Sequence, residues 1–208
     1  MQLNLAIFAS GRGSNFQAIL RAIHQGRLQA RVAVLVADNP EAEAVQIAQA
    51  ANVAAAVIDA RAASAGETFA ADLLATLQSH RANFIVLSGY VRKVPGQVIQ
   101  AYRGRVINIH PALLPSFGGK GMYGRRVHEA VLHHGCKVSG ATVHFVEEEY
   151  DTGAPIVQRC VPVLDEDTPD TLAARVLEIE HQILPEALQL FAEDRVQILG
   201  RRVLIRTD

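Results

Sequence analysis

Residues 106–115 have the sequence VINIHPALLP, the most informative stretch of the chain. Its first residues are mostly β-branched and apolar, which predicts a buried strand. Side chains two positions apart on a strand point to the same face, so Asn108 and His110 are predicted to project together. Pro111 cannot donate to a sheet ladder and should end the strand. An amide and an imidazole at the carboxyl end of a strand indicate a ligand site. The alternative is a pair of hydrogen-bonded polar residues at the end of the strand.

Apolar runs and helical patterns alternate on the N-terminal side of this stretch. Near-continuous apolar strands are typical of a parallel sheet that is covered on both faces. Strands are predicted at 3–10, 31–37, 54–58 and 83–88, with helices at 16–26, 40–51, 66–80 and 95–102. The alternation predicts an α/β fold with a Rossmann-like open, mostly parallel sheet and helices on both faces.

The pattern changes on the C-terminal side. A helix at 125–134 is followed by two strands, 138–146 and 155–163, which a loop joins without a helix. Such a connection predicts an antiparallel extension of the sheet. Thr168 is a predicted cap for a long helix that reaches about Ala192, and the tail is predicted to form a hairpin. We expect one domain over residues 1–208.

Composition excludes several classes of partner. The chain has 208 residues, of which 50% are hydrophobic, and a net charge of −1. This balance does not favour nucleic acid or an anionic membrane surface. Cys136 and Cys160 lack metal-ligand spacing, and His128 and His133 are five residues apart, so no metal site is expected. The N-terminal residues contain no basic segment, so no signal peptide is expected. We expect a cytoplasmic protein that is monomeric or homodimeric.

Residues 11–15, GRGSN, lie between a predicted strand and a predicted helix. Glycines let backbone N–H groups approach an anion, and a helix N-terminus favours negative charge, so the loop predicts a phosphate site. An ordinary tight turn is the alternative. A dinucleotide site would also use Gly11, Gly13 and, after the second strand, Asp38, but Phe16 stands where that motif needs its third glycine. An NAD-dependent oxidoreductase is therefore the alternative from another enzyme class.

Residues 147–151, EEEYD, form an acidic loop that is mostly a solvated hairpin tip. Asp151 differs because a tight turn can direct it inward, where its charge would stabilise a protonated His110. Asn108 would then stabilise an oxyanion and His110 would donate a proton. We find no convincing nucleophile, so direct transfer between substrates is favoured over a covalent intermediate. The glycine-rich segment 116–124 lacks the spacing of a phosphate loop and is expected to form a lid.

Three motifs, at 108–115, 11–15 and 149–153, resemble those of the folate-dependent formyltransferases. The resemblance covers nearly the whole chain and is strongest to the enzymes that formylate glycinamide ribonucleotide. It implies transfer of a formyl group from 10-formyltetrahydrofolate to the amine of that nucleotide in de novo purine biosynthesis, without a metal. It also implies a phosphate-binding half, 1–104, and a catalytic and folate-binding half, 105–208.

The resemblance also implies roles for individual residues. Catalysis would involve Asn108, His110 and Asp151. The substrate nucleotide would be bound by Gly13, Ser14, Asn15 and Glu180. The folate would be bound by Val91, Arg92, Lys93, Val94, Asn108, Glu147, Glu148, Glu149, Tyr150 and Asp151.

One departure from the family concerns the folate tail. Some members place an arginine in the third helix to bind the tail, but Ala65, Gly66 and Glu67 occupy that region here. Lys93, where some relatives carry an apolar residue, is a candidate replacement. Another folate-dependent formyltransferase or hydrolase activity is the alternative within the superfamily.

Overall fold

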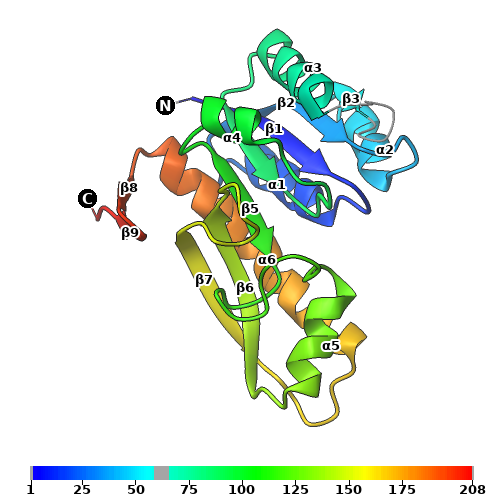
Figure 1. Ribbon diagram of the computed structural model, residues 1–208, viewed down its shortest axis with the longest axis vertical. Helices are drawn as coiled ribbons and strands as arrows, with labels where there is room; N and C mark the ends of the chain where they lie inside the picture. Colours follow the sequence, from blue (N-terminus) through cyan, green and yellow to red (C-terminus); the bar gives the residue numbers. More distant parts are fainter. Residues whose placement is uncertain (1, 59–65, 208) are drawn as a thin grey trace. The chain divides into compact units, whose positions relative to one another are not determined.

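The computed structural model describes residues 2–58 and 66–207. The chain divides into two compact units, Met1–Ile107 and Asn108–Asp208, and strand β5 (Val106–His110) carries the chain from the first to the second. The strands of the main sheet follow the order β3-β2-β1-β4-β5-β6-β7. The predicted α/β fold, with a mostly parallel sheet and an antiparallel C-terminal extension, is confirmed (Figure 1).

The first unit is built around β1 (Leu3–Ala9), a nearly continuous run of buried apolar residues. Strand β1 pairs in parallel with β2 (Ala30–Ala37) on one side and β4 (Phe84–Leu87) on the other, and β2 pairs with β3 (Ala55–Val57). The helices are α1 (Ser14–His24), α2 (Glu43–Ala50), α3 (Gly66–Ser79) and α4 (Gly96–Ala101). Because these strands are parallel, the residues that follow β1, β2 and β4 meet at one sheet edge.

Helix α2 begins later than residue 40, where the sequence predicted it. The side chain of Asn39 accepts a hydrogen bond from the backbone N–H of Glu41, and its backbone carbonyl accepts one from Ala42. These bonds hold a turn in place of the first helical residues, because an Asn side chain competes for backbone donors. The start at residue 40 was therefore wrong by three residues.

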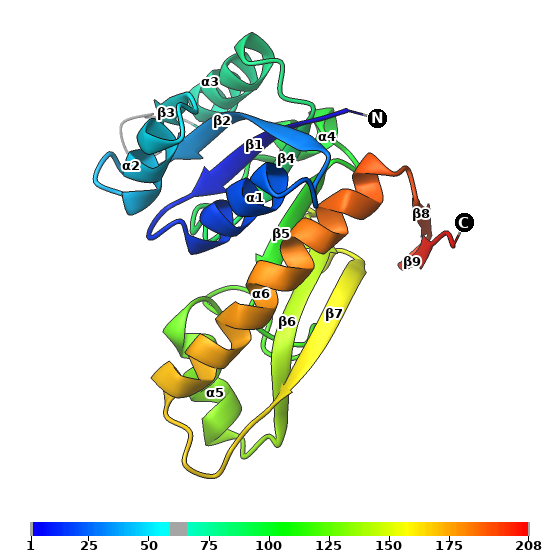
Figure 2. The same cartoon turned by 180° about the vertical axis from the view of Figure 1, so that it is seen from behind.

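The second unit pairs β6 (Val138–Phe145) antiparallel with β7 (Pro155–Pro162). Helix α6 (Pro169–Ala192) runs along β6 and β7 and packs against α5 (Arg125–His133), as Figure 2 shows. Thr168 caps α6 through reciprocal hydrogen bonds with Thr171, and the helix continues through Pro185. Strands β8 (Val196–Leu199) and β9 (Arg202–Ile205) form the predicted C-terminal hairpin.

Residues 65–67, where the resemblance predicts an arginine in some family members, lie outside the residues whose side chains the structure describes. Within residues 2–58 and 66–207, no helix combines the length and the apolar character needed to cross a membrane.

Candidate active site

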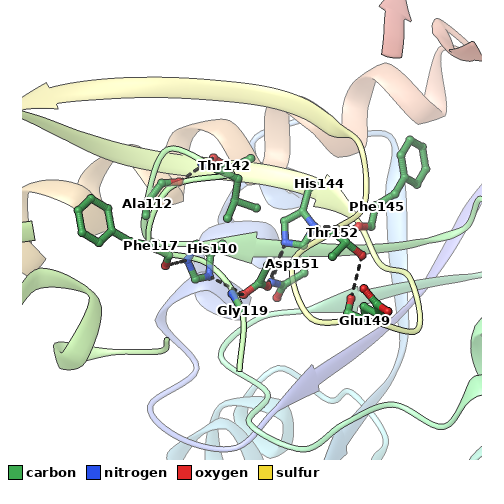
Figure 3. Close-up of polar contacts among 12 residues, drawn as sticks. His110, Ala112, Phe117, Gly119, Thr142, His144, Phe145, Glu149, Asp151 and Thr152 are labelled. Carbon is green, nitrogen blue, oxygen red and sulfur yellow. Dashed lines mark hydrogen bonds and ion pairs between the residues drawn. The ribbon is translucent and has the colours of Figure 1, made fainter. Parts of the chain in front are cut away.

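His110 lies at the end of β5 and is 3% exposed. Its Nε2 is 2.8 Å from the carbonyl oxygen of Phe117, so Nε2–H donates a hydrogen bond there. Its Nδ1 faces Oδ2 of Asp151 at 3.7 Å, a distance longer than a hydrogen bond (Figure 3). With Nε2 occupied, Nδ1 is the nitrogen that can gain or lose a proton beside the carboxylate.

Asp151 is directed inward by its backbone. It adopts a left-handed conformation with φ of 57°, which is uncommon for a residue other than glycine. A Cβ at the neighbouring Gly153 would lie 1.8 Å from the carbonyl oxygen of Phe145, so only glycine fits this turn. The side chain of Asp151 is only 12% exposed, and its Oδ2 accepts a hydrogen bond of 2.8 Å from the N–H of Gly119.

His144 joins this cluster from β6. Its Nδ1–H donates to the carbonyl oxygen of Phe145 at 2.8 Å, which leaves Nε2 as an acceptor. Nε2 lies 3.0 Å from Nδ2 of Asn108 and 3.6 Å from Oδ1 of Asp151. Burial lowers the pKa of His144 well below its ordinary value, more than the nearby carboxylate raises it. The ring is therefore neutral near pH 7.

The second unit thus brings together Asn108, His110 and Asp151, with His144 as a fourth member. His144 is a member that the sequence alone did not assign to the site. The alternation of side chains along β6 predicts that Thr142 and His144 share a face, but it does not say which structure that face contacts. Assigning that face to the site required the strand order, which places β5 beside β6.

Thr142 fixes the chain after β5. Its hydroxyl donates to the carbonyl oxygen of Ala112 at 2.6 Å and accepts from the N–H of Leu114 at 3.1 Å. Gln158 on β7 donates to the same hydroxyl and to the carbonyl oxygen of Leu114. These bonds satisfy buried polar groups of the segment that follows His110.

The glycine-rich segment after Leu114 contacts the site directly, through the carbonyl of Phe117 and the N–H of Gly119. A Cβ at Gly118 would lie 2.5 Å from the Leu114 side chain and 3.2 Å from Cβ of Asp151. Two backbone groups on either side of one glycine therefore hold the histidine and the carboxylate.

His128 on α5 is a further buried imidazole, 4% exposed. Burial lowers its pKa, and the charge of His110 lowers it further. Its Nδ1 has no hydrogen-bond partner in the part of the chain that the structure describes. The sequence suggested for His128 only the role of a metal ligand, and no cluster of metal-binding side chains occurs among the described residues.

The other residues assigned to the second unit differ in exposure. Glu147, Glu148 and Glu149 are exposed, and Tyr150 is 42% exposed, so the acidic loop surrounds a single inward-facing carboxylate. Glu180 lies on α6 and is 9% exposed. A buried carboxylate on a helix is costly unless it accepts hydrogen bonds.

The loop before α1 lies in the first unit and has the geometry of an anion site. Gly13 adopts a left-handed conformation, and a Cβ there would lie 2.9 Å from Cα of Ala44. No side chain caps α1 at its N-cap residue, and its first turn contains no acidic residue. Ser14 and the buried Asn15 begin the helix. Backbone N–H groups at such an uncapped terminus can bind a phosphate.

The segment from Val91 to Val94 follows β4, also in the first unit. Val91 is 52% exposed and Lys93 is exposed, whereas Val94 is buried. Arg92 is paired with Asp38, whose Oδ2 lies 3.0 Å from Nε of the arginine. Asp38, the carboxylate of the alternative dinucleotide site, is therefore bound to a guanidinium.

Comparison with known proteins identifies the family. Residues 3–188 match the family described as formyl transferase. The chain is 42% identical over 192 residues to a chloroplastic phosphoribosylglycinamide formyltransferase from Vigna unguiculata, covering 92% of this chain and 62% of that one. It is 35% identical to the phosphoribosylglycinamide formyltransferase of Bacillus subtilis, covering 88% of this chain and 92% of that one.

A solved structure agrees with these relatives. The crystal structure of glycinamide ribonucleotide transformylase 1 from Symbiobacterium toebii superimposes with a TM-score of 0.94 at 41% identity, covering 99% of this chain and 95% of that one. The chain spans less than two thirds of the length of the Vigna relative. The match over residues 3–188 shows that the chain belongs to the formyl transferase family.

Proposed function

We propose that this chain transfers a formyl group from 10-formyltetrahydrofolate to the primary amine of glycinamide ribonucleotide, a step of de novo purine biosynthesis. The observation that carries the proposal is the buried cluster of Asn108, His110, His144 and Asp151 in the second unit. The names of the similar proteins from Vigna, Bacillus and Symbiobacterium support the choice of substrates.

The proposed reaction begins when the neutral amine attacks the formyl carbon. A carbon–nitrogen bond forms, and the formyl oxygen takes on negative charge. One N–H of Asn108 faces His144, so the amide has a second N–H with which it would stabilise this oxyanion. A preorganised donor of this kind stabilises the transition state more than the neutral carbonyl.

A proton must also move. The attacking nitrogen loses a proton, and N10 of the folate gains one as its bond to the formyl carbon breaks. We assign the transfer to Nδ1 of His110, because Nε2 already donates to Phe117. Asp151 would stabilise the imidazolium that forms during the transfer. No covalent bond to the protein is required.

Substrate binding is assigned to separate segments. In the first unit, Gly13, Ser14 and Asn15 would bind the nucleotide phosphate through backbone N–H groups and side-chain donors. Residues 91–94 would bind the pterin. In the second unit, Glu180 would accept hydrogen bonds from the nucleotide, and residues 147–151 would contact the folate.

A reducing compartment such as the cytoplasm is part of the proposal. Cys136 and Cys160, the two cysteines of the chain, are both free thiols in the structure. The enzyme is proposed to act as a monomer or a homodimer, which sedimentation of the purified protein at working concentration would resolve.

An assay with both substrates tests the proposed function. Purified protein is incubated with 10-formyltetrahydrofolate and glycinamide ribonucleotide, and the formylated nucleotide is measured by mass. The expected result is equimolar release of tetrahydrofolate and formylated nucleotide. A parallel reaction without nucleotide measures hydrolysis. Release of formate at the same rate, with no formylated nucleotide, would reject the transferase in favour of a hydrolase.

A further inference from the structure

Three hydrogen bonds within the first unit hold residues 89–92, the segment that follows β4, in a defined position. The N–H of Ser10 donates to the carbonyl oxygen of Gly89 at 3.2 Å, and the N–H of Val91 donates to Oγ of Ser10 at 3.1 Å. Nε of Arg92 donates to Oδ2 of Asp38 at 3.0 Å. Residues at the carboxyl ends of β1 and β2 thus hold both the backbone and a side chain of this segment.

Residues 89–92 expose one apolar side chain, that of Val91, to solvent. Val91 is 52% exposed, although the residue before it contacts the core through Phe8 and the residue after it is ion-paired. Holding an exposed valine in a defined position does not stabilise a fold through burial. An apolar side chain that is held in place at the surface can instead form one wall of a ligand site.

Asp38 is buried, with only 5% of its surface exposed. A buried carboxylate is costly without a charged partner, and Arg92 supplies that charge. Burial raises the pKa of the nearby Tyr90 phenol, and the charge of Asp38 raises it further, so the phenol stays protonated. Within the described residues, neither Oδ1 of Asp38 nor the Tyr90 hydroxyl has a hydrogen-bond partner. The ion pair with Arg92 is therefore the main restraint on this carboxylate.

We propose that Asp38 is a positioning residue for the folate: its ion pair with Arg92 fixes residues 91–94 in the conformation that receives the pterin. The inference rests on the proposed function, because the proposed function assigns the pterin to residues 91–94. Asp38 itself would not touch the substrate. Its effect would appear in the KM for 10-formyltetrahydrofolate and not in kcat.

A purely structural role makes a different prediction. Asp38 precedes the turn into α2, and α2 supports the phosphate loop, since the N–H of Ala44 donates to the carbonyl oxygen of Gly11 at 3.1 Å. Ala44 also lies close to Gly13, where a Cβ would meet its Cα at 2.9 Å. Loss of the turn would therefore disturb the nucleotide site and raise the KM for glycinamide ribonucleotide.

Kinetics of Asp38→Ala and Asp38→Asn distinguish the two roles. We expect Asp38→Ala to raise the KM for 10-formyltetrahydrofolate by about tenfold, the size typical of a lost charge-assisted hydrogen bond. Both kcat and the KM for the nucleotide should stay within about twofold. Asp38→Asn keeps an acceptor for Arg92 and should show a smaller rise. The control is Asp165→Ala, which removes an exposed ion pair with Lys137.

An Asp38→Ala variant with an unchanged folate KM would overturn the inference, as would an equal rise in both KM values. If that variant does not fold, the folate KM of Asp38→Asn and of Ser10→Ala tests the inference instead. Ser10→Ala removes the acceptor for the N–H of Val91 and should also raise the folate KM alone. Wild-type protein that forms no formylated nucleotide would reject the proposed function and this inference together. Wild-type protein with full activity and an insensitive Asp38 would reject the inference only.

Discussion

Nδ2 of Asn108 lies 3.0 Å from Nε2 of His144, and the direction of this hydrogen bond is fixed by the far side of the ring. His144 donates through Nδ1 to the carbonyl oxygen of Phe145, so its Nε2 must accept. The amide of Asn108 therefore turns its nitrogen toward His144. A neutral histidine thus determines which way a candidate oxyanion donor points.

Replacing His144 should lower turnover without weakening substrate binding. His144→Phe fills similar space but leaves the Asn108 amide without its acceptor, so the amide can rotate away from the oxyanion. We expect kcat to fall by about 10- to 100-fold, in the range seen when one such donor is lost. Steady-state kinetics on both substrates measure the effect. His144→Gln, which restores an acceptor, should recover part of the loss, and the exposed His133→Asn should change nothing.

Removing the proton-transferring group should have a larger effect. We expect His110→Ala to lower kcat by about 10²- to 10⁴-fold, the usual contribution of general acid–base catalysis. The KM for glycinamide ribonucleotide should change little, because its phosphate is assigned to residues 13–15. Single-turnover formyl transfer is the suitable measurement. Wild-type kcat in this variant would contradict the role given to His110.

The charge of Asp151 can be tested separately from its shape. Asp151→Asn keeps an oxygen that can accept from Gly119, but it removes the charge that faces His110 and His144. We expect kcat to fall by about 10- to 100-fold or more, as for loss of electrostatic stabilisation in a buried site. Thr152→Ala, next to it in the same loop, is the control. An Asn variant as active as the wild type would show that the negative charge plays no part.

Substitutions at the start of α1 should affect nucleotide binding. Ser14→Ala and Asn15→Ala each remove a side-chain donor near the helix N-terminus. We expect each to raise the KM for glycinamide ribonucleotide by about 3- to 10-fold while kcat and the folate KM stay near wild type. Gln17→Ala, exposed on the same helix, serves as the control. If neither variant alters nucleotide KM, the phosphate is bound elsewhere.

Much of the fold follows from local sequence. The apolar run at 3–9 predicts a buried central strand, and Thr168 followed by Pro169 marks the start of α6 to the residue. The start of α2 was missed because helix propensity was weighed without the competing bonds of Asn39. Propensity describes one residue at a time, whereas this turn depends on a side chain that binds the backbone two residues on.

The site was only partly predictable for a similar reason. Asn108 and His110 are two apart on one strand, so their common face follows from strand geometry alone. His144 is 34 residues from His110 in sequence, and its place beside Asn108 depends on the order of the strands. Phe117 and Gly119 bind the His110 and Asp151 side chains through their backbone atoms alone, so the residue types at 117 and 119 do not reveal these bonds.

Two buried histidines should make the stability of the protein depend on pH. Burial lowers the folded-state pKa of both His144 and His128 below 6.5, whereas in the unfolded chain both titrate near 6.5. As pH falls through that value, the unfolded state binds protons that the folded state does not. Stability is therefore fully present above about pH 6.5 and declines below it. Each histidine can contribute at most about 1.4 kcal/mol per pH unit.

Thermal unfolding between pH 8 and pH 5 measures this dependence. We expect Tm to be nearly constant above about pH 7 and to fall steadily below about pH 6.5. His128→Phe should reduce the slope on the acid side, because one buried imidazole no longer has to stay neutral. His133→Asn should keep the full slope, since His133 is exposed and is not one of the buried imidazoles. An acid slope equal to that of the wild type in His128→Phe would mean that protonation elsewhere unfolds the protein.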